Sequence, residues 1–513
     1  VQEKDDEGRS FIIEVNGVRV FCKGADWIPC DAFLPRTPDS TYEKLLTMAQ
    51  QAGMNMIRVW GGGVYERDCF YDMCDELGLM VWQDFMFACG EYPEEQWFLN
   101  QVEDEAQKTV RRLRNHPSIV LWCGNNECEW NFCKENPGKS PEEMSGARIF
   151  RDLLPSVVRR LDGTRPYWRS SPFGSGFPND ESNGNYHGWN VWGSWLDFPE
   201  YEKSRARFVT EFGFQAPANE ATFQSVTILE DRRPQSTVME HHNKLGEGTE
   251  RLFRFQAAHY VVATDFAGFI ENGQLVQAEA LKTAAEHWRR RKFRTAGVLF
   301  WQLNDCWPVS SWSVIDSGLR PKAAYFFAKR FFAPVLVSMQ REFGSVDVWG
   351  TNDTLQPIGG MLECSLLSFE GRQLWSKSTR VVLPRNGSKK LIGVKIQKVD
   401  HVDPHRTYLR VRFAPETGPA LVNRLFFAEP KHLQLPVPTI RTVVKKLTEG
   451  KFVVKLESGS FAKNVRLTVE GIDVEMSDNH FDLDPGEHVE VELRSYISLF
   501  RLRRLLRISW LGK

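Results

Sequence analysis

The feature that most limits the fold is an alternation of short apolar runs with helical patterns between residues 20 and 330. Two of the helical stretches, residues 39–53 and 66–78, end at a glycine, Gly53 and Gly78. An apolar run of the kind found in buried strands follows each of these glycines at once. Repetition of a helix, a glycine cap and an apolar strand predicts βα units around a parallel sheet.

Seven apolar runs in this region have the length and bulk of buried strands. They lie at residues 20–27, 55–60, 79–85, 118–127, 165–171, 207–214 and 297–305. This number fits a (β/α)8 TIM barrel in the α/β class, with an eighth strand expected near residues 264–269. A doubly wound open sheet is the alternative. The glycine run at residues 61–65, however, lacks the lysine and the further glycine that a phosphate-binding loop needs.

The pattern changes after Pro334, where apolar and polar residues alternate with a period of two and turns are rich in Gly, Asn, Asp and Pro. This alternation predicts one or two immunoglobulin-like β-sandwich domains. We therefore divide the chain into four parts. They are residues 1–19, a remnant of a preceding β-sandwich or a linker; 20–333, the barrel; 334–430, a β-sandwich; and 431–513, a C-terminal β-sandwich.

Charge and cysteine usage limit the partners and the compartment. The net charge of −1 gives no overall field toward nucleic acid or a membrane. The basic end, residues 501–513, is predicted as a last edge strand, with a membrane-contacting helix as the minority alternative. The 10 cysteines have neither a CxxC pair nor a common zinc spacing, so we expect free thiols, no metal and a cytoplasmic setting. A preceding segment could still have carried a signal.

Polar and aromatic residues stand where the predicted strands end, which in a parallel barrel is the catalytic face. The set has neither a Ser–His pair nor a histidine cluster. Alone, either Glu127 or Glu211 would be read as a strand-end cap. Together, beside amides, an arginine and indoles, they suggest the paired carboxylates of glycoside hydrolysis. The candidate residues at these ends are Asp26, Trp27, Arg58, Trp60, Asp84, Asn126, Glu127, Glu211, Trp301 and Asn304.

Several longer motifs resemble glycoside hydrolase family 2, specifically its β-mannosidase branch. They are KGADWIP, RVWGGGVYE, WCGNNE, TEFGFQ, FWQLNDCWPVSSWSVID and RPKAAYFFAKRFFAPV. The resemblance implies a retaining exo-glycosidase that removes terminal non-reducing β-D-mannose without a cofactor. It implies that Glu127 is the general acid/base and Glu211 the nucleophile, with the two carboxyl groups about 5–5.5 Å apart.

The same resemblance assigns residues to the sugar. Arg58 and Trp60 match the pair that lines the terminal-sugar subsite, Asn126 matches the amide that binds the 2-hydroxyl, and Trp301 matches the indole platform. The motif HGWNVW at residues 187–192 is similar to the loop before the nucleophile strand. It therefore adds His187 and Trp192 to the expected substrate-binding residues.

The resemblance also indicates what precedes such a barrel. Family members carry a jelly roll and an immunoglobulin-like sandwich before it, whereas this sequence starts at what resembles the sandwich's last strand. Residues 11–20 are thus expected to lack sheet partners. Expected partners are a β-mannoside oligosaccharide or glycoside, with a separate N-terminal segment or a homo-oligomer left open. The alternative functions are an exo-β-D-glucosaminidase, another family 2 exo-glycosidase, or an inactive sugar-binding fragment.

Overall fold

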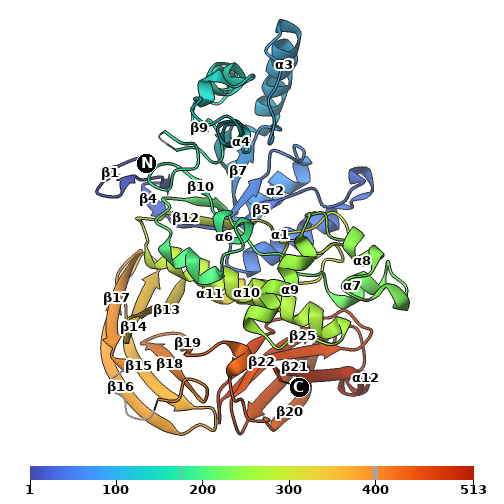
Figure 1. Cartoon of the computed structure of the whole chain (residues 1–513), viewed down its shortest axis with the longest axis vertical. Coiled ribbons are helices and arrows are strands. Elements are labelled where there is room, and N and C mark those ends of the chain that lie inside the picture. The colour runs from blue at the N-terminus through green and yellow to red at the C-terminus, as the bar shows by residue number, and fades with distance from the viewer. Residues whose placement is uncertain (175, 397–401, 513) are drawn as a thin grey trace. The chain divides into compact units, whose positions relative to one another are not determined.

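The computed structural model describes residues 1–174, 176–396 and 402–512. It divides into two compact units, one made of residues 1–252 and 273–333 and the other of residues 253–272 and 334–513. Figure 1 colours the first unit mainly blue to yellow and the strands of the second orange and red. The boundaries that the sequence suggests near residues 19, 333 and 430 remain predictions.

The first unit is built on an eight-stranded parallel sheet, in which apolar runs form the strands because both faces of the sheet are covered. The strand order is β10-β11-β12-β5-β6-β7-β8-β9, as in a TIM-type barrel, so the predicted fold class is confirmed. The strands are β5 (Cys22–Trp27), β6 (Met56–Val59), β7 (Met80–Asp84), β8 (Ile119–Cys123), β9 (Tyr167–Trp168), β10 (Tyr186–His187), β11 (Val209–Glu211) and β12 (Gly297–Phe300).

Helices follow most of these strands and cover the sheet (Figure 1). Gly78, at φ +68°, ends the second helix in the left-handed conformation that glycine adopts without strain. The helices are α1 (Asp39–Gln51), α2 (Asp68–Leu77), α3 (Gln96–Leu113), α4 (Cys128–Glu135), α5 (Leu154–Leu161), α6 (Asn190–Gly193), α7 (Glu220–Gln224), α8 (Thr237–His241), α9 (Gly248–His259), α10 (Phe266–Arg290) and α11 (Ala323–Phe331).

The eighth strand is not where the sequence suggested. Residues 264–269 instead span the start of the 25-residue helix α10, which begins at Phe266, and Asp265 accepts a hydrogen bond from the Gly268 N–H as a helix cap does. The missing strand is β10, of only two residues, Tyr186 and His187. Such a short strand has no apolar run, so its sequence carries no strand signal.

The N-terminal residues fold onto the barrel as two small hairpins, β1 (Lys4–Asp5) with β2 (Gly8–Arg9) and β3 (Ile13–Val15) with β4 (Val18–Val20). Phe11 is only 5% exposed, and its ring contacts Trp168 and Phe208 in the barrel core. The segment pairs with itself as a hairpin and buries Phe11, Ile12 and Ile13, while Val15 stays 39% exposed. That residues 11–20 lack the sheet partners of a preceding sandwich remains a prediction.

The second unit carries four antiparallel sheets, in the orders β13-β14-β17, β16-β15-β18-β19, β20-β21-β25-β23 and β24-β22-β26. Alternate residues of each pair of sheets form one core, as in β-sandwiches. The strands are β13 (Val335–Glu342), β14 (Ser345–Asn352), β15 (Ile358–Ser368), β16 (Gln373–Leu383), β17 (Gly387–Val394), β18 (Thr407–Pro415), β19 (Leu421–Phe426), β20 (Ile440–Thr448), β21 (Lys451–Ser458), β22 (Ala462–Val469), β23 (Glu475–Met476), β24 (Phe481–Leu483), β25 (His488–Arg494) and β26 (Leu506–Ser509).

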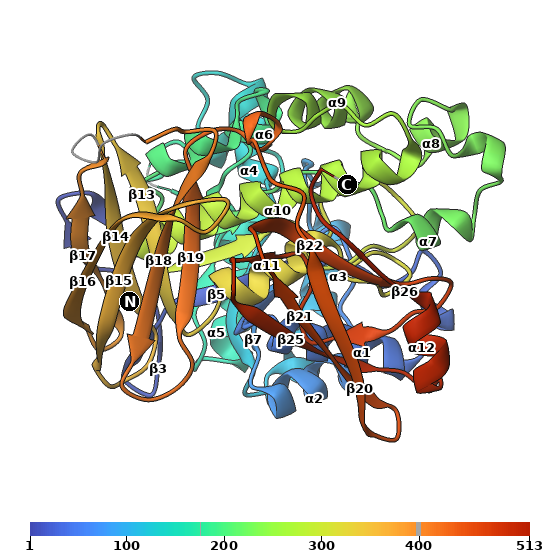
Figure 2. The same cartoon turned by 90° about the horizontal axis from the view of Figure 1, so that it is seen from below.

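The basic C-terminal segment is only partly the edge strand that the sequence suggested. It begins with helix α12 (Leu499–Leu505), which Ser498 caps through a hydrogen bond from the Arg501 N–H, and continues as edge strand β26 (Figure 2). Leu502 of the helix is fully buried in the sandwich core, so this face is structural. Within the described residues, none of the helices has the length and apolar character to cross a membrane.

Candidate active site

The site is organised around Arg58, whose guanidinium lies inside the barrel near the ends of strands β5, β6 and β7. Strand β6 pairs Arg58 with Asp26 of β5, and the side chains meet at 3.1 Å. The guanidinium also donates to Asp84 Oδ2 at 2.9 Å and to Asn126 Oδ1 at 2.7 Å. Alternation along the strands thus turns Asp26, Arg58 and Asp84 to one interior, because every second side chain faces the same side.

Glu211 ends strand β11 and receives a hydrogen bond on each oxygen. Arg58 Nη1 donates to Oε1 and Trp189 Nε1 donates to Oε2, both at 2.8 Å. Two donors, one of them a cation, favour the carboxylate form and fix its orientation. Glu211 is thereby aligned for a reaction that needs a negatively charged oxygen at a defined position.

Glu127 lies four residues beyond the end of β8, just before helix α4, and has a left-handed backbone, with φ +59°. Its side chain is 15% exposed, and Oε1 lies 2.7 Å from His187 Nδ1. The same imidazole nitrogen lies 3.3 Å from Glu211 Oε2. One oxygen of each glutamate and the imidazole nitrogen all lie within 4.8 Å of one another, so the two carboxyl groups face a common space.

Burial shifts the protonation of all three groups. It raises the pKa of Glu127 to about 7, against the weaker opposing effect of Arg58. It lowers the pKa of His187 to about 3, so the ring is neutral at physiological pH. Burial also raises the pKa of Glu211, while Arg58 and the Trp189 N–H oppose that rise. Because Glu127 lacks these two donors, we place the proton shared by the pair on Glu127.

Two indoles flank the space between the strand ends. Trp60 and Trp301 are half-buried, and their ring centroids lie 4.8 Å apart in an edge-to-face arrangement. The glycine run after Trp60 has a steric cause, because a Cβ on Gly62 would lie 2.0 Å from the Trp60 ring. Partly exposed indoles of this kind offer flat apolar surfaces that suit the C–H face of a sugar ring.

Several expected substrate-binding residues have other contacts. Trp27 is 1% exposed and donates to Glu66 behind the sheet, since it follows the inward-facing Asp26 along the strand. Asn304 is buried and bonds to both backbone groups of Ile28. Trp192 is 4% exposed and packs on Phe214 and Trp312. That Trp27, Trp192 and Asn304 touch the substrate therefore stays a prediction, and the structure shows these three side chains in contact with other protein groups.

Asp26 and Asp84 are also fully buried, and both of them face Arg58. They therefore position the guanidinium rather than line the open part of the site. Of the other candidates, the structure brings Arg58, Asn126, Glu127, His187 and Glu211 into one network, with Trp60 and Trp301 as a neighbouring pair.

Sequence reasoning missed three contributors. Trp189 lies in the motif that supplied His187, but the start of helix α6 decides which tryptophan turns inward. Ser171 Oγ lies 2.9 Å from His187 Nε2, and Ser171 is the last residue of the predicted strand 165–171. Cys89, two residues after Phe87 in the loop beyond β7, lies beside Glu127. A search of every strand end together with the loop that follows it would have included Ser171 and Cys89.

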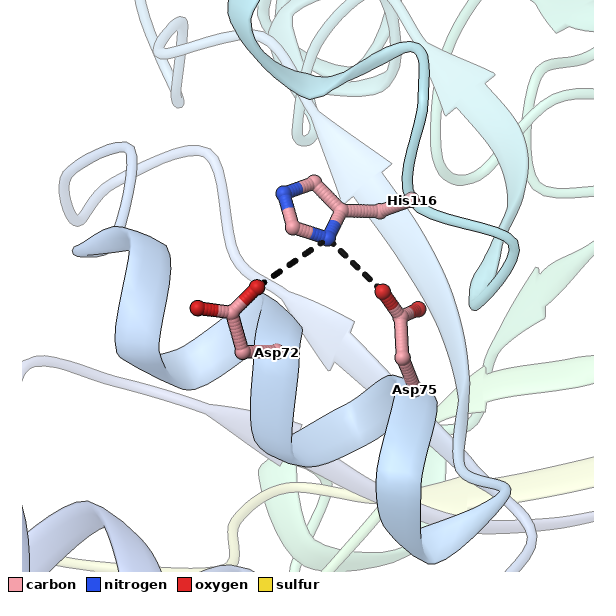
Figure 3. Close-up of side chains that lie close together, drawn as sticks. All are labelled: Asp72, Asp75 and His116. Carbon is pink, nitrogen blue, oxygen red and sulfur yellow. Dashed lines mark hydrogen bonds and ion pairs between the residues drawn. The ribbon is translucent and has the colours of Figure 1, made fainter.

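A second group with metal-ligand chemistry is formed by Asp72 and Asp75 of α2 and by His116 (Figure 3). His116 Nδ1 lies 2.8 Å from Asp75 and 3.9 Å from Asp72. Asp75 also accepts the Ser118 N–H at 2.8 Å, just before β8 begins. These bonds join α2 to the loop just before a strand begins. That loop lies on the N-terminal face of the barrel, where residues serve stability rather than catalysis.

The arrangement as a whole defines the class of protein. It is a TIM-barrel protein with paired carboxyl groups, a buried arginine and two indoles at the strand ends, which is the arrangement typical of glycoside hydrolases.

Comparison with known families agrees. Residues 43–174 match "Glycosyl hydrolases family 2, TIM barrel domain", residues 344–432 match "Mannosidase Ig/CBM-like domain" and residues 435–511 match "Ig-fold domain". The chain therefore contains a glycoside hydrolase family 2 TIM-barrel domain followed by Ig-like domains, and the resemblance read from its motifs is confirmed.

Individual relatives point to one branch of the family. The chain is 34% identical to beta-mannosidase B of Thermothelomyces thermophilus over 94% of this chain, and 35% identical to beta-mannosidase B of Aspergillus niger over 100% of it. A crystal structure of a beta-D-mannosidase from Dictyoglomus thermophilum is 42% identical, with a TM-score of 0.95 over 99% of this chain. The chain spans 62%, 64% and 62% of the lengths of these three proteins.

A more distant structure shares the fold alone. An exo-chitosanase of Amycolatopsis orientalis is 16% identical and superposes with a TM-score of 0.78, covering 100% of this chain and 65% of that one.

Proposed function

We propose that this chain is the catalytic part of an exo-β-mannosidase that removes terminal non-reducing β-D-mannose with retention of configuration. The observation that carries the proposal is the Glu127–Glu211 pair. One oxygen of each glutamate lies within 4.8 Å of the other, and of these two residues only Glu211 accepts a hydrogen bond from Arg58 among the described contacts. Retaining enzymes hold their carboxyl groups about 5–5.5 Å apart, whereas inverting enzymes leave about 6.5–9.5 Å for a water. The named relatives support mannose as the sugar.

The mechanism follows from the two protonation states. Glu211 attacks the anomeric carbon as a carboxylate, and the glycosidic C–O bond breaks as Glu127 gives its proton to the leaving oxygen. A glycosyl ester on Glu211 results. Glu127, now a carboxylate, takes a proton from water, whose oxygen attacks the anomeric carbon and releases Glu211. Loss of the negative charge on Glu211 in the ester lowers the pKa of Glu127 and so prepares it as a base.

Other residues hold the terminal sugar in this proposal. Asn126 is bonded to Arg58 through Oδ1, which turns its Nδ2 away from the guanidinium as a donor for the 2-hydroxyl. Trp60 and Trp301 provide the ring platform, and neutral His187 keeps Glu127 next to Glu211. A hydroxyl held at the 2-position strengthens its bond in the transition state and so contributes to rate as well as to recognition.

The first experiment measures hydrolysis of 4-nitrophenyl β-D-mannopyranoside by this chain, beside the β-D-glucosaminide and β-D-glucoside. We expect turnover of the mannoside that is lost in Glu211→Ala, and NMR of the fresh product should show the β-anomer first. Inverted product would overturn the two-glutamate displacement. Preferred hydrolysis of the glucosaminide would overturn the sugar assignment.

Because the chain spans under two thirds of its relatives, a second arm adds the N-terminal segment of a relative as a separate polypeptide. Activity that appears only in the mixture would assign part of the site to that segment. A folded chain with no turnover in either arm would contradict the proposed function.

A further inference from the structure

We propose that Cys89 is a positioning residue for the acid/base, because its sulfur joins the Asn126 amide to the Glu127 carboxyl group. The inference rests on the proposed function and adds a residue that neither family resemblance nor strand-end reasoning had assigned. Cys89 Sγ lies 3.7 Å from Glu127 Oε2, and Asn126 Nδ2 donates to the same sulfur at 3.5 Å. One thiol thus contacts the two neighbours that handle the leaving oxygen and the 2-hydroxyl.

The backbone holds the thiol in this place. The Cys89 N–H donates to the Asn126 carbonyl at 2.8 Å, and the Asn126 N–H donates to Phe87 at 2.9 Å. Cys89 has φ +57° and Glu127 has φ +59°, so both contacting residues occupy the left-handed region that non-glycine residues rarely adopt. Strain of this kind persists where the surrounding structure fixes it, and it gathers at functional sites.

Packing alone does not account for a cysteine here. All 10 cysteines lie in the described part of the chain, and Cys89 is the exposed one, while the others are buried or half-buried. A cysteine that fills a core is among the most buried residue types. An exposed thiol that is pinned against two polar side chains is explained by the bonds that it makes.

The thiol is in its donor form at neutral pH. Partial removal of its sulfur from water, with the charge of Glu127 second, raises the pKa of Cys89 to about 12. The S–H therefore donates to Glu127, which favours the carboxylate form of that residue. Other charged or titratable groups act on the pair from several elements: Arg58, Lys134, His187 and Glu211 on Glu127, and Tyr92 and Cys128 on Cys89.

The test uses the whole chain and two mannosides that differ in their need for an acid. Methyl β-D-mannopyranoside has a poor leaving group and needs the proton of Glu127, whereas the 2,4-dinitrophenyl mannoside does not. We expect Cys89→Ala to lower kcat/KM for the methyl glycoside about 2- to 10-fold, the worth of one net hydrogen bond, and to leave the dinitrophenyl glycoside unchanged. The alkaline limb of the pH profile should move to higher pH, because a donor to the carboxylate is lost.

Cys69→Ala is the matched control, since Cys69 Sγ lies 3.7 Å from Asp39 Oδ1, the same kind of contact outside the site. It should change neither substrate. Equal losses on both mannosides in Cys89→Ala, with an unmoved pH profile, would overturn the proposal and leave Cys89 with a structural role.

A second readout needs no turnover. The S–H stretch of Cys89 is isolated by subtracting the infrared spectrum of Cys89→Ala, and we expect the band to shift to higher frequency in Glu127→Gln. An S–H stretching frequency that is the same in the wild type and in Glu127→Gln would overturn the contact. Should the wild-type chain hydrolyse no mannoside, either alone or with the N-terminal segment of a relative, the proposed function fails on its own, and this spectrum still decides whether the thiol is bonded to Glu127.

Discussion

Two arginine–carboxylate networks in this chain differ in charge balance. In the barrel, the fully buried Arg58 faces three carboxyl groups, those of Asp26, Asp84 and Glu211. In the second unit, two arginines, Arg424 and Arg410, face three acids, Asp484, Glu487 and Glu363. The first network therefore has less positive charge per acid than the second.

The pKa values of one buried aspartate in each network are shifted in opposite directions. Burial raises the pKa of Asp26 well above its ordinary value, and Arg58 only partly offsets this. Burial would raise the pKa of Asp484 too, but Arg424, the Tyr408 hydroxyl and Arg410 outweigh it and the pKa is lowered. Shifted carboxyl groups of the first kind are typical of functional sites, whereas an acid held ionised in a bidentate pair joins elements.

The difference teaches how one chain separates catalysis from assembly. Arg424 of β19 pairs with Asp484 through two bonds of 2.8 Å, which joins the first sandwich to the loop after β24 in the second. Arg58 instead divides its donors among four acceptors and leaves Asp26 Oδ2 without a hydrogen-bond partner among the described residues. Acidic groups whose charge is only partly neutralised lower the stability of the fold, and the same groups are available for reaction.

The largest expected effect is the separation of activity from stability in Glu211→Ala. Loss of the nucleophile should lower kcat on the mannoside by about 10⁴-fold or more, because the covalent step is removed. The free energy of unfolding should stay the same or rise, since one of three acids crowding Arg58 is gone. Denaturant titration beside kinetics checks this. A large loss of stability with little loss of rate would reverse the assignment of the two networks.

The corresponding substitution in the second network is Asp484→Asn. We expect the free energy of unfolding to fall by about 2–4 kcal/mol, less than for a fully buried pair because Arg424 is 14% exposed. Steady-state kinetics should give an unchanged kcat/KM per folded molecule. The apolar double variant Arg424→Met with Asp484→Leu should recover part of the stability, since no charge is then left unpaired. No recovery would mean that shape, rather than charge balance, holds the two sandwiches.

How much of these networks could be predicted differs between them. The barrel site was accessible because parallel strands end at one face, so Arg58, Glu127 and Glu211 could be placed together from their positions after apolar runs. The contacts of Trp27 with Glu66 and of Asn304 with Ile28 could not be predicted, because the end of a strand is known from sequence more securely than the side to which each residue there points.

The sandwich network could not be predicted at all. Arg424 lies in strand β19 of one sandwich and Asp484 in the loop after β24 of the other, and neither stands out in the sequence. Only the packing of one sandwich on the other brings them together, and periodicity carries no information on that contact. The two-residue strand β10 was missed for a related reason, since its place is set by neighbouring strands rather than by its own residues.

A smaller effect sharpens the comparison at Glu211. Trp189→Phe keeps the ring but removes the N–H that lies 2.8 Å from Oε2. A hydrogen bond to a charged group is worth about 1.5–3 kcal/mol, so kcat should fall roughly 10- to 100-fold. Trp192→Phe is the matched control, since that indole contacts Phe214 and Trp312 and should change kcat little. Equal losses in both variants would indicate packing rather than the bond to the nucleophile.

The smallest effect is a difference in the sign of pH dependence between the two networks. Because the pKa of Glu127 is raised to about 7, kcat/KM should fall about tenfold per pH unit above pH 7, and Glu127→Gln should lack this limb. The raised value also means that its contribution to stability is complete below pH 4.5 and is lost as pH rises toward 7.

Asp484 has the opposite sign. Its pKa is lowered, so its contribution is present above pH 3.8 and is lost as pH falls through the lowered value. Thermal unfolding between pH 2 and pH 8, with Asp484→Asn and Glu127→Gln as the paired variants, separates the two. Asp484→Asn should flatten the acid side of the stability curve alone, and Glu127→Gln should flatten only the segment between pH 4.5 and about 7. Variants that flatten the same side would show that charge balance does not distinguish the networks.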